Sequence, residues 1–194
     1  MRCCRALYLV GVSLLPTLGA EELTATLDPA KTKITFTLKD VLHVVRGTFQ
    51  LKEGHVSFDP ATGACNGTVV VDAASGKSGN TVRDKRMARS ILEADRYPEI
   101  RFTPTQLAGS ISFSAASTVE VSGSFSIHGQ AHKITIPMQI RAMQNEISAE
   151  GKFVVPYVQW GMKNPSNFLL KVNDTVEIEV IAVGLLTGMP HNRN

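Results

Sequence analysis

The chain has 194 residues, of which 20 are Lys or Arg and 17 are Asp or Glu, and without Arg2 and Arg5 in the first twenty positions the balance is 18 to 17. This near-neutral charge argues against a nucleic-acid-binding protein. Aromatic residues make up only 6% of the chain and show no girdle pattern, which argues against a barrel inserted in an outer membrane.

The first twenty residues are predicted to be a signal peptide. Arg2 and Arg5 give a positive start, residues 6–18 form an apolar run, and Gly19-Ala20 ends it with small residues. The run is shorter than the roughly 20 apolar residues that a membrane-spanning helix needs. We therefore expect a periplasmic or secreted protein that does not span a membrane, with one domain over residues 21–186 and a loose tail over residues 187–194.

Alternation of apolar and polar residues dominates this domain and predicts strands with one dry and one wet face. The clearest runs are residues 33–39, 133–141 and 175–180, and weaker runs occur at residues 47–51, 56–58, 68–71, 100–102, 111–113, 119–127, 147–149 and 153–155. Hairpin turns are predicted at Asp28-Pro29, Glu53-Gly54, Asp59-Pro60, Asn66-Gly67, Ala108-Gly109, His128-Gly129, Glu150-Gly151 and Asn173-Asp174. This rhythm favours an all-β antiparallel fold, either a closed barrel or a sandwich.

One segment, Thr81 to Ala94, breaks the alternation. Met87 and Ile91 are four residues apart, which is helical spacing. The run from Ser90 to Glu93 reads as a capping box, so a second short helix is predicted to start at Ser90. We expect this helical insertion to pack its apolar positions across the mouth of a barrel.

The chain shows few signs of catalysis or of metal binding. His128 and His132 are four apart, but Gly129 predicts a turn between them, so surface histidines are favoured over a zinc site. Nucleophile-elbow, P-loop and dinucleotide motifs are absent from the sequence. Cys65, beside a predicted turn, is expected to be an exposed loop cysteine, with a reactive thiol or a homodimer as the alternative. We expect neither a cofactor nor a metal.

Arg83-Asp84, at the entrance to the helical insertion, is the most suggestive polar pair. These side chains offer donors and acceptors for a charged or hydroxyl head group. An exposed ion pair is the simpler interpretation from the residues alone.

The order of short motifs along residues 27–185 resembles the YceI-like family of polyisoprenoid-binding, lipocalin-like proteins. The matching segments are the strand at residues 34–39 followed by His43, Val45-Arg46-Gly47-Thr48-Phe49, Phe58-Asp59-Pro60, Arg83-Asp84, Tyr97-Pro98-Glu99-Ile100-Arg101-Phe102, residues 123–129, Trp160-Gly161-Met162 and residues 172–176. The sequence departs from the family pattern at residues 156–159, where an Arg and an Asp are usual.

This resemblance implies an extended, antiparallel, eight-stranded barrel around an apolar channel that holds a long-chain isoprenoid or similar lipid. Among the inward-facing apolar positions, we expect this channel to be lined by Phe36, Leu38, Phe49, Phe102, Phe125, Ile127, Ile136 and Trp160. We expect His43, Arg83 and Asp84 to lie at the mouth. Two alternatives stay open: an enzyme that acts on an apolar substrate at the mouth, and a ligand-free stress or interaction protein with a filled core.

Overall fold

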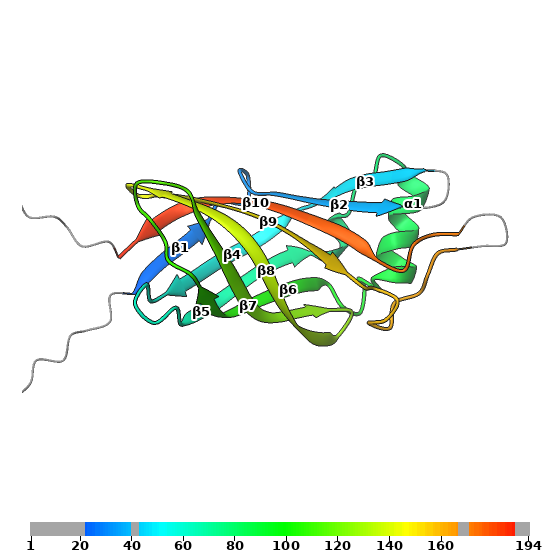
Figure 1. The fold of residues 1–194 in the computed structure, drawn as a ribbon. Coiled ribbons are helices and arrows are strands. Elements are labelled where there is room, and N and C mark those ends of the chain that lie inside the picture. Colours follow the sequence, from blue (N-terminus) through cyan, green and yellow to red (C-terminus); the bar gives the residue numbers. More distant parts are fainter. Residues whose placement is uncertain (1–21, 40–42, 167–170, 189–194) are drawn as a thin grey trace, which may run out of the picture.

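The computed structural model describes residues 22–39, 43–166 and 171–188, so the predicted signal peptide and most of the predicted tail lie outside it. Ten strands form one antiparallel sheet (Figure 1). They are β1 (Leu23–Leu27), β2 (Lys33–Lys39), β3 (Val44–Phe49), β4 (Leu51–Phe58), β5 (Cys65–Asp72), β6 (Glu99–Ala108), β7 (Ser117–Ile127), β8 (Gln130–Met143), β9 (Glu146–Val155) and β10 (Val176–Thr187).

The sheet closes into the predicted eight-stranded barrel, because β1 pairs with both β4 and β10. The ten segments make eight strands of the barrel because two strands are interrupted. Along β10, β1 pairs with residues 184–187 and β2 with residues 177–181, and the short loop between β1 and β2 passes over Val183. There the Asp28 amide donates to the Val183 carbonyl at 2.8 Å. In the same way only Gln50 separates β3 from β4.

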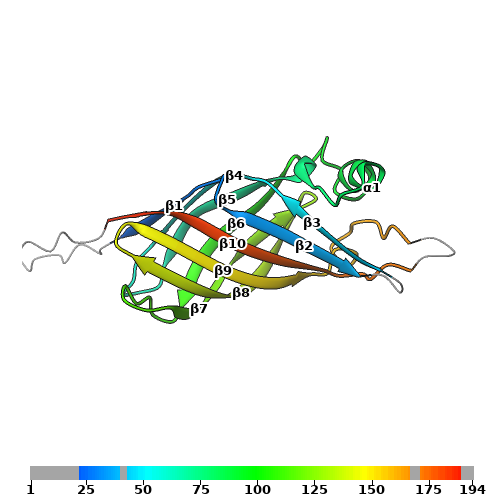
Figure 2. The same ribbon diagram turned by 90° about the horizontal axis from the view of Figure 1, so that it is seen from above.

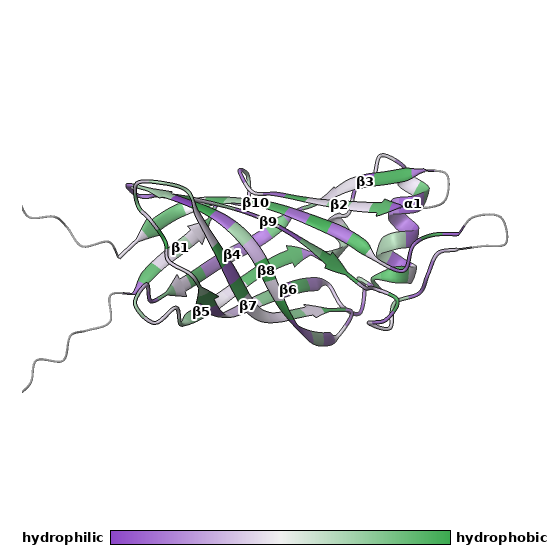
Figure 3. Ribbon diagram, viewed as in Figure 1, coloured by the Kyte–Doolittle hydropathy of each residue, from purple (hydrophilic) through white to green (hydrophobic). Residues whose placement is uncertain are grey.

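Side chains alternate between the two faces of the barrel wall, except at register shifts in β4 and β6. In β7, every second residue from Ser117 to Ile127 is buried, and the residues between them are exposed or half-buried. This is the period of two that the sequence predicts for a strand with one dry face. Hydropathy drawn on the ribbon shows the same alternation of apolar and polar positions along the strands (Figure 3).

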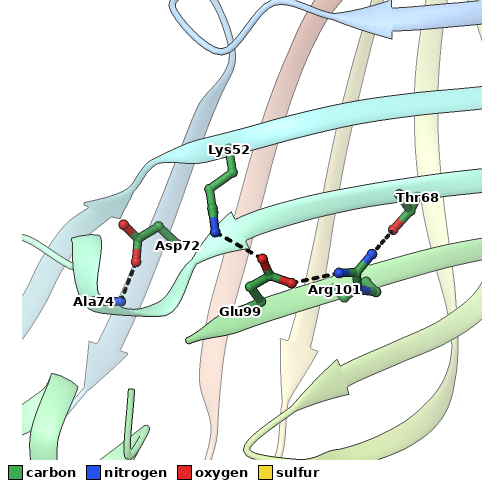
Figure 4. A network of polar contacts seen from close by, with 6 residues as sticks. All are labelled: Lys52, Thr68, Asp72, Ala74, Glu99 and Arg101. Atoms are coloured by element: carbon green, nitrogen blue, oxygen red, sulfur yellow. Dashed lines mark hydrogen bonds and ion pairs between the residues drawn. The ribbon is translucent and has the colours of Figure 1, made fainter. Parts of the chain in front are cut away.

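The outer face is wet and carries a network of charged side chains across β4, β5 and β6 (Figure 4). Glu99 accepts from Lys52 Nζ at 2.9 Å and from an Arg101 guanidinium nitrogen at 2.6 Å, and Arg101 also donates to Thr68 Oγ1 at 3.2 Å. The hydrogen bond from Lys52, followed by the one from Arg101, holds the pKa of Glu99 below its usual range. The charged side chains thus lie on the outer face, and apolar side chains of the same three strands face the inside.

Three predicted turns lie inside strands instead. Glu53-Gly54 belongs to β4, Asn66-Gly67 to β5 and Glu150-Gly151 to β9. In β4 the register shifts between Leu51 and Glu53, which marks a bulge and brings Gly54 to the buried side. A Cβ at Gly54 would lie 2.6 Å from Leu27 Cδ1, so the glycine allows a close approach and does not form a turn.

The remaining differences concern connections. The turn between β8 and β9 is at Gln144-Asn145, where Gln144 has a φ of 52°, and it was not among the predicted turns. Residues 111–113, predicted as a strand, lie in the loop between β6 and β7. The predicted hairpin turn at His128-Gly129 is confirmed, with φ values of 51° and 73°.

The helical insertion stands at one end of the barrel, opposite the end where β1 begins and β10 finishes (Figures 1 and 2). It consists of α1 (Thr81–Arg86), which continues directly into a π-helical turn, η2 (Met87–Ile91). Asn80 caps α1, because its side chain accepts from the amides of Val82 and Arg83. The predicted second helix at Ser90 is wrong, since Ser90 lies within η2.

Candidate functional site

A cavity of about 630 Å³ lies inside the barrel. Its lining includes inward-facing side chains from all ten strands, from Ala25 and Leu27 in β1 to Ala182 in β10. The volume falls within the roughly 300–1,000 Å³ that is usual for small-molecule sites. The barrel is therefore hollow: its inward-facing apolar side chains pack against one another in part and surround a cavity in part.

Polar groups in the cavity lining are few and lie mainly at one end. Most of the wall is aliphatic or phenylalanine. The lining side chains that carry nitrogen or oxygen are Thr32, Ser78, Asn80, Arg83, Arg86 and Tyr157. Four of these belong to α1 or to the loop that leads into it, so we call this end the mouth. An amphiphile with one polar head and a long apolar tail matches this distribution.

Seven of the eight predicted lining residues do line the cavity: Phe36, Leu38, Phe49, Phe102, Phe125, Ile127 and Ile136. They come from β2, β3, β6, β7 and β8, so the fold brings together residues that are up to one hundred positions apart. The Phe36 and Phe49 rings pack with centroids 5.4 Å apart, and Phe125 meets Phe153 edge-on at 5.6 Å.

Trp160, the eighth predicted lining residue, is not among those that line the cavity. It lies in the turn between β9 and β10, and its ring stacks on His132 with centroids 4.0 Å apart and planes within 4°. Its centroid is 5.9 Å from that of Phe125, which does line the cavity. Trp160 thus supports a wall residue and does not form part of the wall.

The predicted Arg83-Asp84 pair is divided between two surfaces. Arg83 lines the cavity, and its guanidinium donates to the Ser78 hydroxyl at 2.8 Å and to the Ser78 carbonyl at 2.9 Å. Asp84 faces a second, smaller pocket and accepts hydrogen bonds from the amide and the hydroxyl of Ser78. These hydrogen bonds lower the pKa of Asp84. Asp84 therefore fixes the loop before α1.

His43 and Arg86 complete the comparison between predicted and observed site residues. His43 is exposed just before β3 and is not among the cavity-lining residues. Arg86 lines the cavity, although it was not predicted as a site residue, and its guanidinium donates to the Pro165 carbonyl at 3.4 Å. Helical spacing offered a signal for Arg86, because residues three apart, such as Arg83 and Arg86, share a helix face.

The segment between β9 and β10 borders the mouth opposite the helix and is anchored by Tyr157. This residue is 5% exposed, and its hydroxyl donates to the Asn173 carbonyl at 2.7 Å. Burial, with a smaller contribution from the Asp174 charge, raises the pKa of Tyr157 to about 12. Asn164 adds a second link, donating to Asp174 Oδ1 at 2.6 Å. Met162, Pro165 and Val172 of this segment line the cavity.

Cys65 is half-buried and lines the cavity, so the expectation of an exposed loop cysteine was wrong. The reason is that Asn66-Gly67 continues β5 and does not turn the chain. The Cys65 thiol lies 3.5 Å from the Gly63 carbonyl, and burial raises its pKa. This thiol sits against the cluster of buried side chains at the end away from the mouth.

The two histidines of the β7–β8 hairpin make separate contacts. His128 Nε2 is 3.5 Å from Glu93 Oε1, whereas His132 packs on Trp160. Within residues 22–39, 43–166 and 171–188, no three His, Cys, Asp or Glu side chains gather as metal ligands would. None of the helices in these same ranges has the length and apolar character needed to cross a bilayer.

Comparison with known proteins identifies the fold. The family profile of the YceI-like domain matches residues 26–183. A UPF0312 protein of Vibrio cholerae is 31% identical over 94 residues, which are 47% of this chain and 48% of that protein, so the match spans about half the length of the curated relatives.

Solved structures extend the likeness over most of the chain. BcnA of Burkholderia cenocepacia is 22% identical with a TM-score of 0.68, and the match covers 81% of this chain and 99% of BcnA. A polyisoprenoid-binding domain from Saccharophagus degradans is 17% identical with a TM-score of 0.65, and the match covers 84% of this chain and 98% of the domain. At these identities the likeness shows a shared fold.

Proposed function

The chain belongs to the YceI-like family, and from this premise we propose that it is a binding protein that holds one long apolar lipid, of the isoprenoid class, inside its barrel. The observation that carries the proposal is the cavity of about 630 Å³, whose wall is apolar from the end away from the mouth up to the helix. The likeness in fold to a polyisoprenoid-binding domain supports the choice of lipid.

The energetics favour a long tail. Each isoprene unit has five carbons, so its transfer from water contributes at most about 4 kcal/mol at roughly 0.8 kcal/mol per carbon. Ordering of the tail and loss of its overall freedom offset much of this gain. Because the apolar wall makes no directional demand, the length of the cavity and the polar groups at the mouth would set the specificity.

For the head of the lipid we propose contacts with Arg83 and Arg86, the two charged residues among the described residues that line the cavity. Arg83 is oriented by two hydrogen bonds to Ser78, and Arg86 reaches across to Pro165. A guanidinium can donate several hydrogen bonds in a fixed geometry to a phosphate or a carboxylate. His43 and Asp84, which the sequence also suggested, are placed less favourably because neither lines the cavity.

The same observations weigh against the two alternatives. A ligand-free interaction protein would be expected to fill its barrel with side chains, whereas this barrel encloses a cavity. An enzyme at the mouth would need a general acid or base beside the substrate, and the Asp84 carboxylate is turned to the smaller pocket. We further propose that the protein carries or sequesters its lipid in the periplasm, after removal of the predicted signal peptide.

Two linked measurements test the proposal. Native mass spectrometry of protein purified from its own host should show a bound lipid, which extraction identifies. Alkylation by N-ethylmaleimide, followed at the peptide that contains Cys65, should be slower for loaded than for delipidated protein, because Cys65 lines the cavity. Protein that never carries or takes up an isoprenoid would contradict the proposal, and so would loading that leaves the Cys65 rate unchanged.

A further inference from the structure

The helical side of the mouth is strongly basic. From Thr81 to Ile91, α1 and η2 carry Arg83, Lys85, Arg86 and Arg89 against one acidic residue, Asp84, whose carboxylate is engaged by Ser78. Lys163 and Lys171, both exposed, belong to the segment that borders the mouth on the other side. Basic side chains thus stand on two sides of the opening.

The opposite end of the barrel has no such charge. Its loops are residues 59–64, 109–116 and 144–145, and within these described loops Asp59 is the charged residue and neither Lys nor Arg occurs. These loops and the helical insertion lie at opposite ends of the elongated barrel (Figures 1 and 2). Because the connection over residues 73–98 carries six Lys or Arg against Asp84, Glu93 and Asp95, positive charge predominates at the end where the cavity is lined by polar groups. A near-neutral net charge conceals this separation.

An exposed apolar residue lies within the basic region. Val82, in the first turn of α1, lines the cavity and yet is 78% exposed. At the same end, Val44 opens β3 and is 50% exposed. Lys85 and Arg89 follow Val82 at helical spacings of three and seven residues, so they lie near it on the helix surface; both are exposed and line the smaller pocket, together with Asp84 and Asp95. Basic and apolar side chains together are the composition that binds the interface of an anionic bilayer.

We propose that this end of the molecule docks on an anionic phospholipid bilayer, with Val82 at the lipid boundary and Lys85 and Arg89 near the phosphate groups. The inference rests on the proposed function, because a barrel that exchanges a membrane lipid must bring its opening to the membrane. Docking in this orientation would let the tail pass into the cavity without crossing water. The positive charge selects the anionic surface and orients the barrel before contact.

Vesicle co-sedimentation at low salt tests the docking. Wild-type protein should bind vesicles of equal parts phosphatidylcholine and phosphatidylglycerol, should release them as salt is raised, and should bind pure phosphatidylcholine weakly. Near an anionic surface each Lys or Arg contributes about 1 kcal/mol, so the double variant Lys85→Gln/Arg89→Gln should bind about thirtyfold more weakly.

A matched control isolates position from net charge. The variant Lys33→Gln/Arg141→Gln removes the same charge from exposed positions on the barrel wall, in β2 and β8. It should bind anionic vesicles nearly as well as the wild type. Equal losses in the two double variants, or wild-type protein that does not bind anionic vesicles, would overturn the docking proposal.

Loading from detergent micelles separates this proposal from the proposed function. Lys85 and Arg89 are not among the residues that line the cavity, so their double variant should take up isoprenoid from micelles at the wild-type level. Loss of vesicle binding with intact micelle loading supports docking. Vesicle binding without any isoprenoid uptake would indicate a membrane-bound protein of another function, and would overturn docking as a step in lipid exchange.

Discussion

The two ends of the barrel differ in how their side chains are used. Away from the mouth, Leu23, Val119, Ala142 and Leu186 are at most 2% exposed and belong to one continuous apolar cluster. At the mouth, Val82 is 78% exposed, and hydrogen bonds to Ser78 and Pro165 hold the arginines that line the opening. The closed end is built for stability, whereas the mouth keeps apolar and charged groups accessible.

This difference explains how a hollow barrel stays folded. A cavity gives up contacts among the side chains that line it, and this loss destabilises the folded state. The closed cluster, with strands paired all around the barrel, compensates for the loss. Substitutions should therefore affect stability most at the closed end, and ligand binding most along the cavity and at the mouth.

The largest expected effect is on stability at the closed end. Leu186→Ala removes a side chain that is 1% exposed and should lower the free energy of unfolding by about 2–5 kcal/mol. Its neighbour Leu185 points outward and is 59% exposed, so Leu185→Ala is the control. This substitution should change the free energy of unfolding by less than about 0.5 kcal/mol. Urea unfolding measures both. Similar losses of stability in the two variants would contradict the view that the apolar cluster at the closed end stabilises the barrel.

A second prediction concerns the length of the lipid. Ala149 lines the cavity and packs against the closed cluster, so Ala149→Phe should shorten the space available to a tail. We expect binding of the longest isoprenoids to weaken by about tenfold or more, at about 1–3 kcal/mol for an overfilled site, while short ones bind nearly as before. Competition between chain lengths, read by native mass spectrometry, gives the result.

Ser148→Phe, on the opposite face of the same strand, is the control for Ala149→Phe. It should leave the length preference unchanged, since successive residues of a strand point to opposite faces. If both variants changed the preference alike, the effect would come from a general disturbance of β9.

At the mouth, Arg86→Gln should weaken binding of an isoprenoid phosphate by about tenfold, the equivalent of losing one charge-assisted hydrogen bond of about 1.5 kcal/mol. Binding of the uncharged alcohol of the same length should hardly change, because its tail contacts are the same. The ratio of the two dissociation constants is the measurement. A ratio equal to that of the wild type would remove Arg86 from the head-group site.

The smallest expected effect depends on pH and concerns the Tyr157 anchor. The pKa of the buried Tyr157 is raised to about 12 from a usual value near 10, so the folded state keeps this proton longer than the unfolded state. Its contribution to stability is complete below about pH 10 and is lost as the pH rises through about 12.

Tyr157→Phe tests this dependence. The variant lacks the hydrogen bond to Asn173 and should be less stable than the wild type by about 1 kcal/mol at pH 8. Between about pH 10 and pH 12 the difference should shrink, because the wild-type tyrosine then loses its proton on unfolding. Urea unfolding midpoints of the two proteins, measured across this pH range, give the result. A stability difference that stayed constant with pH would refute the raised pKa of Tyr157.

The sequence by itself determined the strands and the dry face of the barrel. Alternation at residues 33–39 and 119–127 is a local signal, because a period of two follows from the geometry of an extended chain. The ordered motifs identified the family, and seven of the eight residues predicted to face the channel line the cavity. Glycine in a turn pair was a weaker guide, since Gly54 marks a bulge where Leu27 packs from another strand.

Only the tertiary structure decided which residues face the cavity at the mouth and whether the barrel is hollow. Arg83 and Asp84 are adjacent in sequence but face different pockets, because successive residues of a helix point about a quarter of a turn or more apart. Trp160 turns onto His132, and Cys65 turns inward, through contacts made by distant segments. An apolar face of a sheet can be buried against other side chains or around a ligand, and both arrangements give the same alternation in the sequence. The cavity could therefore be recognised only in the folded barrel.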